Sequence, residues 1–215
     1  MKNSSYWLKE EKKPVQPLSY HGSHDFHMIV VGGGYTGLNC ALALQKAGKK
    51  VLLLEKEQIG WGASCRNAGM LLAGVKAPMA KVAKQYDLSF ARSLWQWTLD
   101  SIDHVRKLIA KENISCHWQD SGSLELAHRK KDLLKLQKQK EFLEREFCYK
   151  SMELVGPGLL SDEIGSGAFE GGLLDLSAAS LHPGLYLAGL AKLVKEAGVT
   201  ILEGASVKEL SLIHI

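Results

Sequence analysis

The order of apolar and polar residues near the start of the chain predicts a β–α–β unit. Residues 27–31 (HMIVV) form a short apolar run rich in β-branched side chains, which is typical of a buried parallel strand. Apolar residues then recur at helical spacing over residues 36–47, and Gly48 is the expected stop of that helix. A second apolar run over residues 51–54 (VLLL) ends at Glu55. These segments predict two buried parallel strands joined by one helix.

The pattern beyond this unit predicts loops followed by further helices and strands. Residues 60–69 and 165–172 are rich in glycine and small polar residues, which indicates loops. Trp95 lies on the apolar stripe of an amphipathic helix, so we expect it in the core rather than at a cofactor. Pro183 suits the first position of a helix, and we expect His182 to serve that helix start rather than catalysis. The further elements expected are helices over residues 88–109, 129–147 and 183–198 and strands over residues 123–127, 199–202 and 206–210.

Composition and charge narrow the class of protein. Hydrophobic residues make up 46% of the 215 residues and charged residues 23%, which is ordinary for a globular protein. The net charge of +4 comes from basic residues interleaved with acidic ones, so nothing points to nucleic acid as a partner. Cys40, Cys65, Cys116 and Cys148 are far apart and lack metal-ligand spacing, so we expect reduced thiols and no metal site. No apolar run reaches the roughly 18 residues of a membrane helix and no secretory signal precedes Pro14, so we expect a cytoplasmic protein without a membrane span.

A glycine-rich turn between the first strand and its helix predicts a dinucleotide site. Gly32, Gly34 and Gly37 form a G-x-G-x-x-G motif. The first glycine allows a tight turn, the second lets the backbone approach a pyrophosphate, and the third lets helix and strand pack closely. The pyrophosphate charge would meet free N–H groups and the positive end of the helix dipole. Glu55 can accept hydrogen bonds from ribose hydroxyls, and the alternative is a structural turn with Glu55 at the surface.

The motif serves both FAD and NAD, and the loop over residues 60–69 (GWGASCRNAG) favours FAD. It offers small residues for close approach, hydroxyl and amide groups, and Arg66 for anionic oxygen. A nicotinamide enzyme normally proceeds from the acidic residue into the next helix, whereas a long loop of small residues suits a cofactor that runs on to a flavin. A plain surface loop is the other interpretation. Two alternative functions stay open: an NAD(P)-dependent Rossmann dehydrogenase and a non-catalytic FAD-binding fragment.

The two loops carry a resemblance to a known family. Residues 30–70 (VVGGGYTGLNCALALQKAGKKVLLLEKEQIGWGASCRNAGM) resemble FAD-dependent amine oxidoreductases of the D-amino-acid oxidase superfamily. The resemblance is to the branch of gamma-glutamylputrescine oxidase, glycine oxidase and sarcosine oxidase. Residues 5–7 (SYW) resemble the N-terminal motif of gamma-glutamylputrescine oxidase-like members, and residues 122–127 (GSLELA) and 182–187 (HPGLYL) also match the branch.

The resemblance implies a fold, a reaction and a set of cofactor contacts. The fold is α/β, with a Rossmann-like FAD-binding domain of the glutathione-reductase type and a partial α+β substrate domain. The reaction is oxidation of a C–N bond in a small amine or amino acid, in which a hydride passes to flavin N5, the imine hydrolyses, and O2 reoxidises the flavin. The resemblance identifies no particular substrate, catalytic residue or oligomeric state. The residues expected at FAD are Gly32, Gly34, Tyr35, Thr36, Gly37, Glu55, Lys56, Ala63, Ser64, Arg66, Asn67, Ala68, Gly69, Met70 and Val207.

The resemblance gives these residues different roles. The glycines of the turn hold the pyrophosphate, Glu55 holds the adenosine ribose with Lys56 beside it, and the backbone of Val207 pairs with adenine. The loop over residues 63–67 lines the pyrophosphate, ribityl chain and flavin, and residues 68–70 approach the flavin ring. Cys65 departs from the family pattern, in which a small residue, usually glycine, is expected.

Four segments follow from these expectations. Residues 1–26 are polar and without period, and we interpret them as an arm that lies over the domain or is partly mobile. We expect the FAD-binding core and flavin loop over residues 27–85, a helical region with part of a substrate domain over 86–180, and a return to the FAD-binding domain over 181–215. The last five residues are apolar and strand-like. The resemblance also implies a protein of about twice this length. Because an open apolar strand edge invites pairing, we expect a truncated chain.

Overall fold

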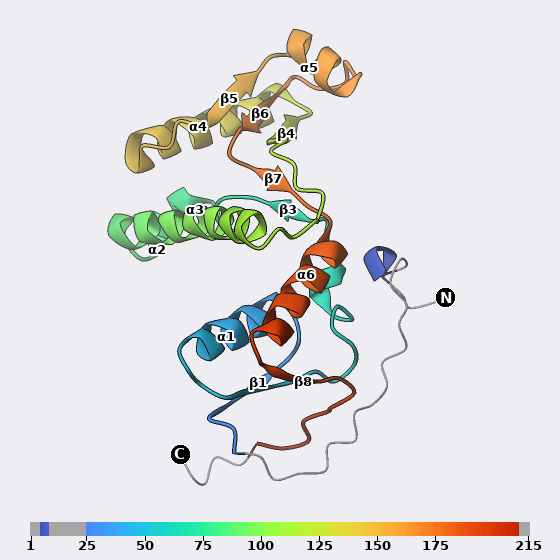
Figure 1. Ribbon diagram of the computed structural model, residues 1–215. Coiled ribbons are helices and arrows are strands. Elements are labelled where there is room, and N and C mark those ends of the chain that lie inside the picture. The colour runs from blue at the N-terminus through green and yellow to red at the C-terminus, as the bar shows by residue number, and fades with distance from the viewer. Residues whose placement is uncertain (1–4, 9–24, 211–215) are drawn as a thin grey trace. The chain divides into compact units, whose positions relative to one another are not determined.

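The chain folds into two compact units. The computed structural model describes residues 5–8 and 25–210. The first unit combines the segments Met1–Gly69, Ile109–His117 and His182–Ile215, and the second combines Met70–Leu108 with Trp118–Leu181. Figure 1 traces this path, in which the early and late parts of the chain meet in one unit.

The first unit holds a parallel sheet and two helices. Its strand order is β1 (Met28–Val31), β2 (Val51–Leu54) and β8 (Thr200–Leu202). Helix α1 (Tyr35–Lys46) connects β1 to β2, so the predicted β–α–β unit is confirmed. Helix α6 (Pro183–Glu196) lies beside α1 and leads into β8 (Figure 1). The core of this unit comes from both helices and from β2, with Leu38, Ala41, Leu53, Leu187, Leu190 and Val194 almost fully buried.

Strand β1 is more exposed than its sequence predicted. Met28, Ile29 and Val31 are 43%, 60% and 57% exposed, so the expectation of a buried strand is wrong for these residues. Among the residues that the structure describes, β1 pairs with β2 alone. A parallel strand is buried only where neighbours cover both its faces and its edges, and β1 has described neighbours on one edge.

The segment after β8 forms no strand. Residues 205–210 have no regular secondary structure, so the predicted strand over 206–210 is wrong. The residues just before this segment bond to the chain that follows β2. The backbone N–H of Gly204 donates to the backbone oxygen of Glu57 at 2.8 Å, and the backbone N–H of Ala205 donates to the backbone oxygen of Glu55 at 2.8 Å. The apolar run over residues 211–215 lies outside the described residues. So does most of the predicted arm over residues 1–26, namely residues 1–4 and 9–24.

The second unit contains an antiparallel sheet in the order β4 (Ser123–Ala127), β6 (Gly171–Asp175) and β5 (Met152–Val155). Helix α4 (Lys130–Phe147) packs against all three strands. A separate two-stranded sheet pairs β3 (Met70–Leu71) with β7 (Ala179–Ser180). The remaining helices are α2 (Met79–Gln85), α3 (Leu88–Lys111), whose last three residues belong to the first unit, and α5 (Pro157–Ile164).

Trp95 lies at the centre of the core of the second unit. It is 4% exposed and meets the rings of Tyr149 and Phe147 edge-on, with centroids 4.9 and 5.9 Å away. The prediction that Trp95 is a core residue is therefore confirmed. Within the described ranges, no helix is long and apolar enough to cross a membrane.

Candidate functional site

The glycine turn between β1 and α1 has the steric features that its motif predicted. Gly32 has a φ of +102°, a conformation that side chains with a Cβ rarely adopt. A Cβ on Gly37 would lie 1.9 Å from the backbone oxygen of Gly32, so helix and turn could not approach as they do. The loop over residues 60–69, which we call the second loop, packs against this turn. A Cβ on Gly34 would lie 2.9 Å from the Oγ of Ser64 in that loop.

The start of α1 is suited to an anion. Gly34 is the N-cap residue of this helix and provides no side chain that could accept its free N–H groups. The backbone N–H of Tyr35 donates to the Oγ of Ser64 at 3.1 Å, so a hydroxyl of the second loop already lies at the helix N-terminus. Free N–H groups and the positive end of the helix dipole favour negative charge at this place.

Glu55 connects the end of β2 to the glycine turn. Its Oε2 accepts the backbone N–H of Gly33 at 2.6 Å, and its Oε1 accepts the backbone N–H of Glu57 at 3.0 Å. Each carboxylate oxygen has a second lone pair for a further donor, such as a hydroxyl group. Glu55 therefore shapes the site and remains able to accept hydrogen bonds from a ligand.

The second loop is organised by its own polar side chains. The amide nitrogen of Asn67 donates to the backbone oxygens of Ala63 and Ser64 at 3.0 and 2.9 Å, and its amide oxygen accepts the N–H of Gly69 at 2.8 Å. The Nε of Arg66 donates to the backbone oxygen of Trp61 at 2.7 Å, and its guanidinium lies 4.9 Å from the centre of the indole ring. These contacts give the loop a defined shape that includes the short helix η2 (Ala63–Cys65).

A cavity of about 240 Å³ joins the turn, the end of β2 and the second loop. Half of its lining was expected from the sequence, namely Gly34, Glu55, Lys56, Ala63 and Ser64. The other half was missed: Gly33, Glu57, Gly60, Trp61 and Gly62. Gly33, Glu57 and Gly62 each stand directly beside a predicted residue, whereas Gly60 and Trp61 do not. The pairing of Trp61 with Arg66 depends on the folded shape of the loop over residues 60–69, which the sequence did not indicate.

The remaining predicted residues do not line this cavity. Gly32, Tyr35, Thr36 and Gly37 form the turn and the start of α1, while Arg66, Asn67, Ala68 and Gly69 continue the second loop. Met70 is the first residue of β3 and belongs to the second unit. Val207 is half-buried in the irregular segment after β8.

Burial controls the ionisation of two groups near the second loop. Burial raises the pKa of the Cys65 thiol to about 11, which leaves it protonated and a poor nucleophile near neutral pH. Burial also raises the pKa of Tyr35 far above its usual value, and the Tyr35 hydroxyl donates to the backbone oxygen of Pro183 at 3.3 Å. Both groups therefore stay neutral and act through packing and hydrogen bonds.

His182 has the structural role expected of it. Its Nδ1 accepts the backbone N–H of Leu185 at 3.1 Å, which caps the N-terminus of α6. Pro183 follows at the first position of the helix, as predicted. Across residues 5–8 and 25–210, no three His, Cys, Asp or Glu side chains gather as a metal site would require.

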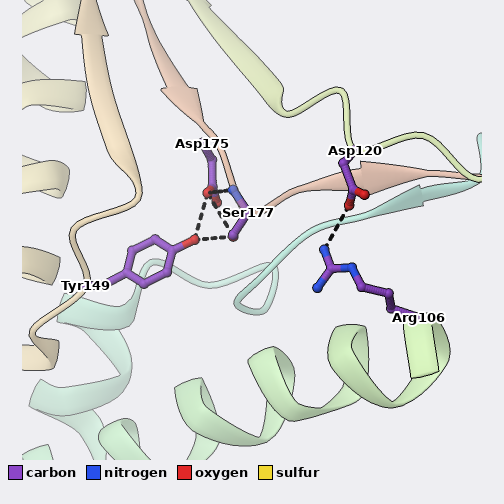
Figure 2. A network of polar contacts seen from close by, with 5 residues as sticks. All are labelled: Arg106, Asp120, Tyr149, Asp175 and Ser177. Carbon is purple, nitrogen blue, oxygen red and sulfur yellow. Dashed lines mark hydrogen bonds and ion pairs between the residues drawn. The ribbon is translucent and has the colours of Figure 1, made fainter.

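A second polar network lies in the second unit (Figure 2). Asp175 Oδ1 accepts hydrogen bonds from the hydroxyl of Tyr149 at 2.7 Å and from the backbone N–H and hydroxyl of Ser177 at 3.0 and 2.9 Å. Figure 2 also shows Arg106 reaching Asp120, with Nη2 and Oδ1 2.9 Å apart. Tyr149 and Asp175 are buried and satisfy each other, so this network stabilises the ends of β5 and β6 rather than offering a reactive group.

The residues around the cavity fit part of a dinucleotide. Glycines at the turn leave room for a pyrophosphate, and the start of α1, whose N-cap residue Gly34 has no side chain, favours its negative charge. Glu55 can accept hydrogen bonds from the hydroxyls of a ribose. Small-molecule sites usually have volumes of about 300–1,000 Å³. A cavity of about 240 Å³ therefore suits the phosphate and ribose portion rather than a whole FAD.

Comparison with known proteins places the chain among flavoenzymes. Residues 27–214 match the profile of the family described as "DAO: FAD dependent oxidoreductase". The probable oxidoreductase OrdL of Haemophilus influenzae is 35% identical over 210 residues, which cover 96% of this chain and 48% of that protein. The gamma-glutamylputrescine oxidoreductase of Escherichia coli is also 35% identical over 210 residues, which cover 98% of this chain and 47% of that protein. The chain thus spans about half the length of the curated relatives it matches.

Solved structures share the fold. Glycine oxidase from Geobacillus kaustophilus aligns with a TM-score of 0.66 and 22% identity, over 85% of this chain and 47% of that one. L-Amino acid deaminase from Proteus myxofaciens aligns with a TM-score of 0.74 and 16% identity, over 93% of this chain and 43% of that one. At these identities the likeness shows the fold alone, and it confirms the predicted class, an α/β FAD-binding domain with part of a second, α+β domain.

Proposed function

Because the chain belongs to the family of FAD-dependent oxidoreductases that matches residues 27–214, we propose that its first unit binds FAD and that the whole protein oxidises a C–N bond in an amine or amino acid. The observation that carries FAD binding is the cavity shared by the glycine turn, Glu55 and the second loop. The three parts suit different portions of one ligand. The glycine turn suits a pyrophosphate and Glu55 suits a ribose, so a ligand that carries both groups would contact all the walls of the cavity.

Each part of the cavity holds a different portion of the cofactor in this proposal. Gly34 and the first N–H groups of α1 hold the pyrophosphate, and Glu55 accepts the ribose hydroxyls. Ala63 and Ser64 line the path from the pyrophosphate toward the ribityl chain, which is where the second loop approaches the turn. Lys56 is largely exposed, with its Nζ 4.0 Å from Glu57, so it contributes charge at the rim and little fixed geometry.

The proposed reaction follows from the relatives. The names gamma-glutamylputrescine oxidoreductase, glycine oxidase and L-amino acid deaminase refer to an amine derivative or to amino acids. When bound, FAD supplies the capacity to accept the two electrons of C–N oxidation, and we propose O2 as the final acceptor. In this proposal the described residues of the first unit bind and orient the cofactor. Glu55 accepts two backbone N–H groups and Cys65 stays protonated, so neither side chain is placed to transfer a proton.

The second unit has the form of a partial substrate domain in this proposal. Its antiparallel sheet β4–β6–β5 is covered by α4, which is an α+β arrangement distinct from the parallel sheet of the first unit. A sheet of three paired strands is a rigid support on which a binding surface for a small amine can be built.

FAD binding is tested by titrating the purified chain with FAD and following flavin fluorescence. We expect FAD to bind and ADP to compete with it, because the cavity takes the adenosine diphosphate side. Glu55→Ala should weaken binding, whereas Glu125→Ala, at an exposed position on β4, should not. Binding of NAD with equal affinity, or FAD binding that ADP does not affect, contradicts the proposal.

The reaction is tested by adding a panel of amines and amino acids to the flavin-loaded whole protein in air. Bleaching of the visible flavin absorption reports substrate oxidation, and hydrogen peroxide reports O2 as acceptor. Bleaching without peroxide would leave C–N oxidation standing and rule out O2. The absence of bleaching with every amine would contradict the proposed substrate class.

A further inference from the structure

Residues 5–8 bind the second loop through two hydrogen bonds, and we call these four residues the N-terminal clasp. Ser5 is only 5% exposed. Its hydroxyl donates to the backbone oxygen of Cys65 and accepts the backbone N–H of Trp7 at 3.2 Å. The indole N–H of Trp7 donates to the backbone oxygen of Asn67 at 2.8 Å. The clasp thus satisfies two carbonyl groups of one loop with two side chains.

The other side of the clasp rests on the start of α6. The rings of Trp7 and His182 meet edge-on, with centroids 4.7 Å apart. A Cβ on Gly184 would lie 2.5 Å from the backbone oxygen of Trp7, so a larger residue there would displace the clasp. Because His182 is itself fixed by its hydrogen bond to the N–H of Leu185, the clasp joins the loop to a rigid helix end.

The carbonyl groups bound by the clasp belong to the same loop as the cavity lining. Cys65 directly follows Ala63 and Ser64, which line the cavity, and Asn67 bonds back to both of their carbonyl groups. Ser64 also accepts the N–H of Tyr35 at the start of α1. A shift of the loop at Cys65 or Asn67 would therefore move Ser64 relative to the helix.

We propose that the N-terminal clasp is a positioning element of the cofactor site, in which Ser5 and Trp7 hold the second loop at its working distance from α1 without touching the cofactor. This inference rests on the proposed binding of FAD in the first unit. A loop that is already held in place loses little conformational freedom when a ligand binds, so the clasp raises affinity through pre-organisation. A purely stabilising segment would change stability without selectively loosening this loop.

Trp7→Phe is the sharpest test because it removes the indole N–H and keeps an aromatic ring against His182. Its matched control is Trp97→Phe, at a position on α3 that is 60% exposed. We expect Trp7→Phe to weaken FAD binding about fivefold, as for the loss of one hydrogen bond. In the ligand-free chain, hydrogen exchange at the amides of Cys65 and Arg66, which close the turn of η2, should also be about fivefold faster.

Gly184→Ala tests the other side of the clasp. Alanine favours the helix over glycine, so α6 itself should not be weakened by its propensity. The added Cβ must nevertheless push Trp7 away, and we expect the same loss of FAD affinity and the same faster exchange in the loop. Gly158→Ala on α5 is the control, because a Cβ there meets no atom within 4 Å.

The outcomes separate the clasp from the proposed function. If the unchanged chain binds FAD and both variants bind it equally well, the positioning role is wrong while FAD binding stands. Unchanged exchange at Cys65 and Arg66 in both variants would show that the clasp does not hold the loop. Faster exchange in α1 and β2 to the same degree would indicate general destabilisation and also overturn the inference. If the unchanged chain binds no FAD, the proposed function fails and the positioning role fails with it, whatever the exchange data show.

Discussion

Glu55 and Gly33 are joined directly, because the carboxylate at the end of β2 accepts the N–H at the centre of the glycine turn at 2.6 Å. The same carboxylate accepts the N–H of Glu57 on its other oxygen. One side chain therefore sets the spacing between two walls of the cavity before any ligand binds. Its substitution should affect both the fold and the site.

Glu55→Ala should lower the free energy of unfolding by about 1–3 kcal/mol, since two backbone N–H groups lose a charged acceptor. FAD affinity should fall by a similar amount if the carboxylate also binds the ribose. Urea denaturation without FAD and a fluorescence titration with FAD measure the two effects. Glu57→Ala removes a neighbouring exposed carboxylate and should change stability by no more than about 0.5 kcal/mol. Equal effects of the two substitutions would contradict the structural role of Glu55.

Gly37→Ala should destabilise the first unit strongly. The added Cβ would lie 1.9 Å from the backbone oxygen of Gly32, and neither backbone can move without opening the turn. We expect a loss of more than about 3 kcal/mol, in the range of severe steric substitutions. Gly167→Ala, where a Cβ would meet no atom within 4 Å, is the control in thermal unfolding. A folded Gly37→Ala protein of normal stability would show that the turn is not packed as described.

Arg66→Ala should alter the environment of the flavin without unfolding the protein. The Nε of Arg66 donates to the backbone oxygen of Trp61, and its guanidinium lies over the indole ring of Trp61. Trp61 itself lines the cavity. We expect a shifted flavin absorption spectrum or lower FAD occupancy, recorded after dialysis. Arg129→Ala, at an exposed position in the second unit, should leave the spectrum unchanged. A stability change within about 0.5 kcal/mol together with an unaltered spectrum would indicate a plain surface loop.

The alkaline stability of the second unit should depend on Tyr149. Burial, followed by the hydrogen bond to Asp175, raises the pKa of Tyr149 above its ordinary value near 10 (Figure 2). Because the folded pKa exceeds the unfolded one, this group contributes stability that is complete below about pH 10 and is lost as the pH rises through the folded pKa. The unfolding free energy of the unchanged protein should therefore fall more steeply above pH 10 than that of Tyr149→Phe.

Denaturant titrations at a series of pH values test this dependence. At pH 7, Tyr149→Phe should be less stable by about 1–3 kcal/mol because buried Asp175 loses a donor. Tyr86→Phe, at a position that is 63% exposed, should change the unfolding free energy at pH 7 by no more than about 0.5 kcal/mol. Parallel pH profiles for the unchanged protein and Tyr149→Phe would contradict the assigned environment.

The glycine turn could be predicted from the sequence because its determinants are local. The steric demands on Gly32 and Gly37 act between residues only five positions apart, so the motif itself carries the geometry. The adjacent elements α1 and β2 followed from their apolar periodicity for the same reason. The resemblance to the D-amino-acid oxidase superfamily is confirmed by the family match over residues 27–214.

The errors arose where a strand depends on partners that the pattern does not specify. Residues 206–210 were expected to form a strand, yet the N–H groups of Gly204 and Ala205, just before them, donate to the backbone oxygens of Glu57 and Glu55, and no strand follows within the described residues. Strand β6 (Gly171–Asp175) begins inside a predicted loop, since its two glycines suggest a turn. A Cβ on Gly172 would lie 2.8 Å from the side chain of Leu124, so that glycine serves packing across the sheet. Such requirements come from the neighbouring strand and are invisible in the segment itself.

The pairing of β2 with β8 gives the first unit a particular order of assembly during synthesis. Leu53 lies opposite Ile201, so one edge of β2 has no partner until the whole second unit has been translated. At about 5–20 residues per second, that interval lasts on the order of ten to thirty seconds on the ribosome. The backbone N–H and C=O groups on this edge of β2 are open to solvent and to other nascent chains during this time, whereas the contacts of the second unit can all form first. A pause in translation before residue 200 would therefore prolong the aggregation-prone stage, and a chaperone that shields β2 would act during that interval.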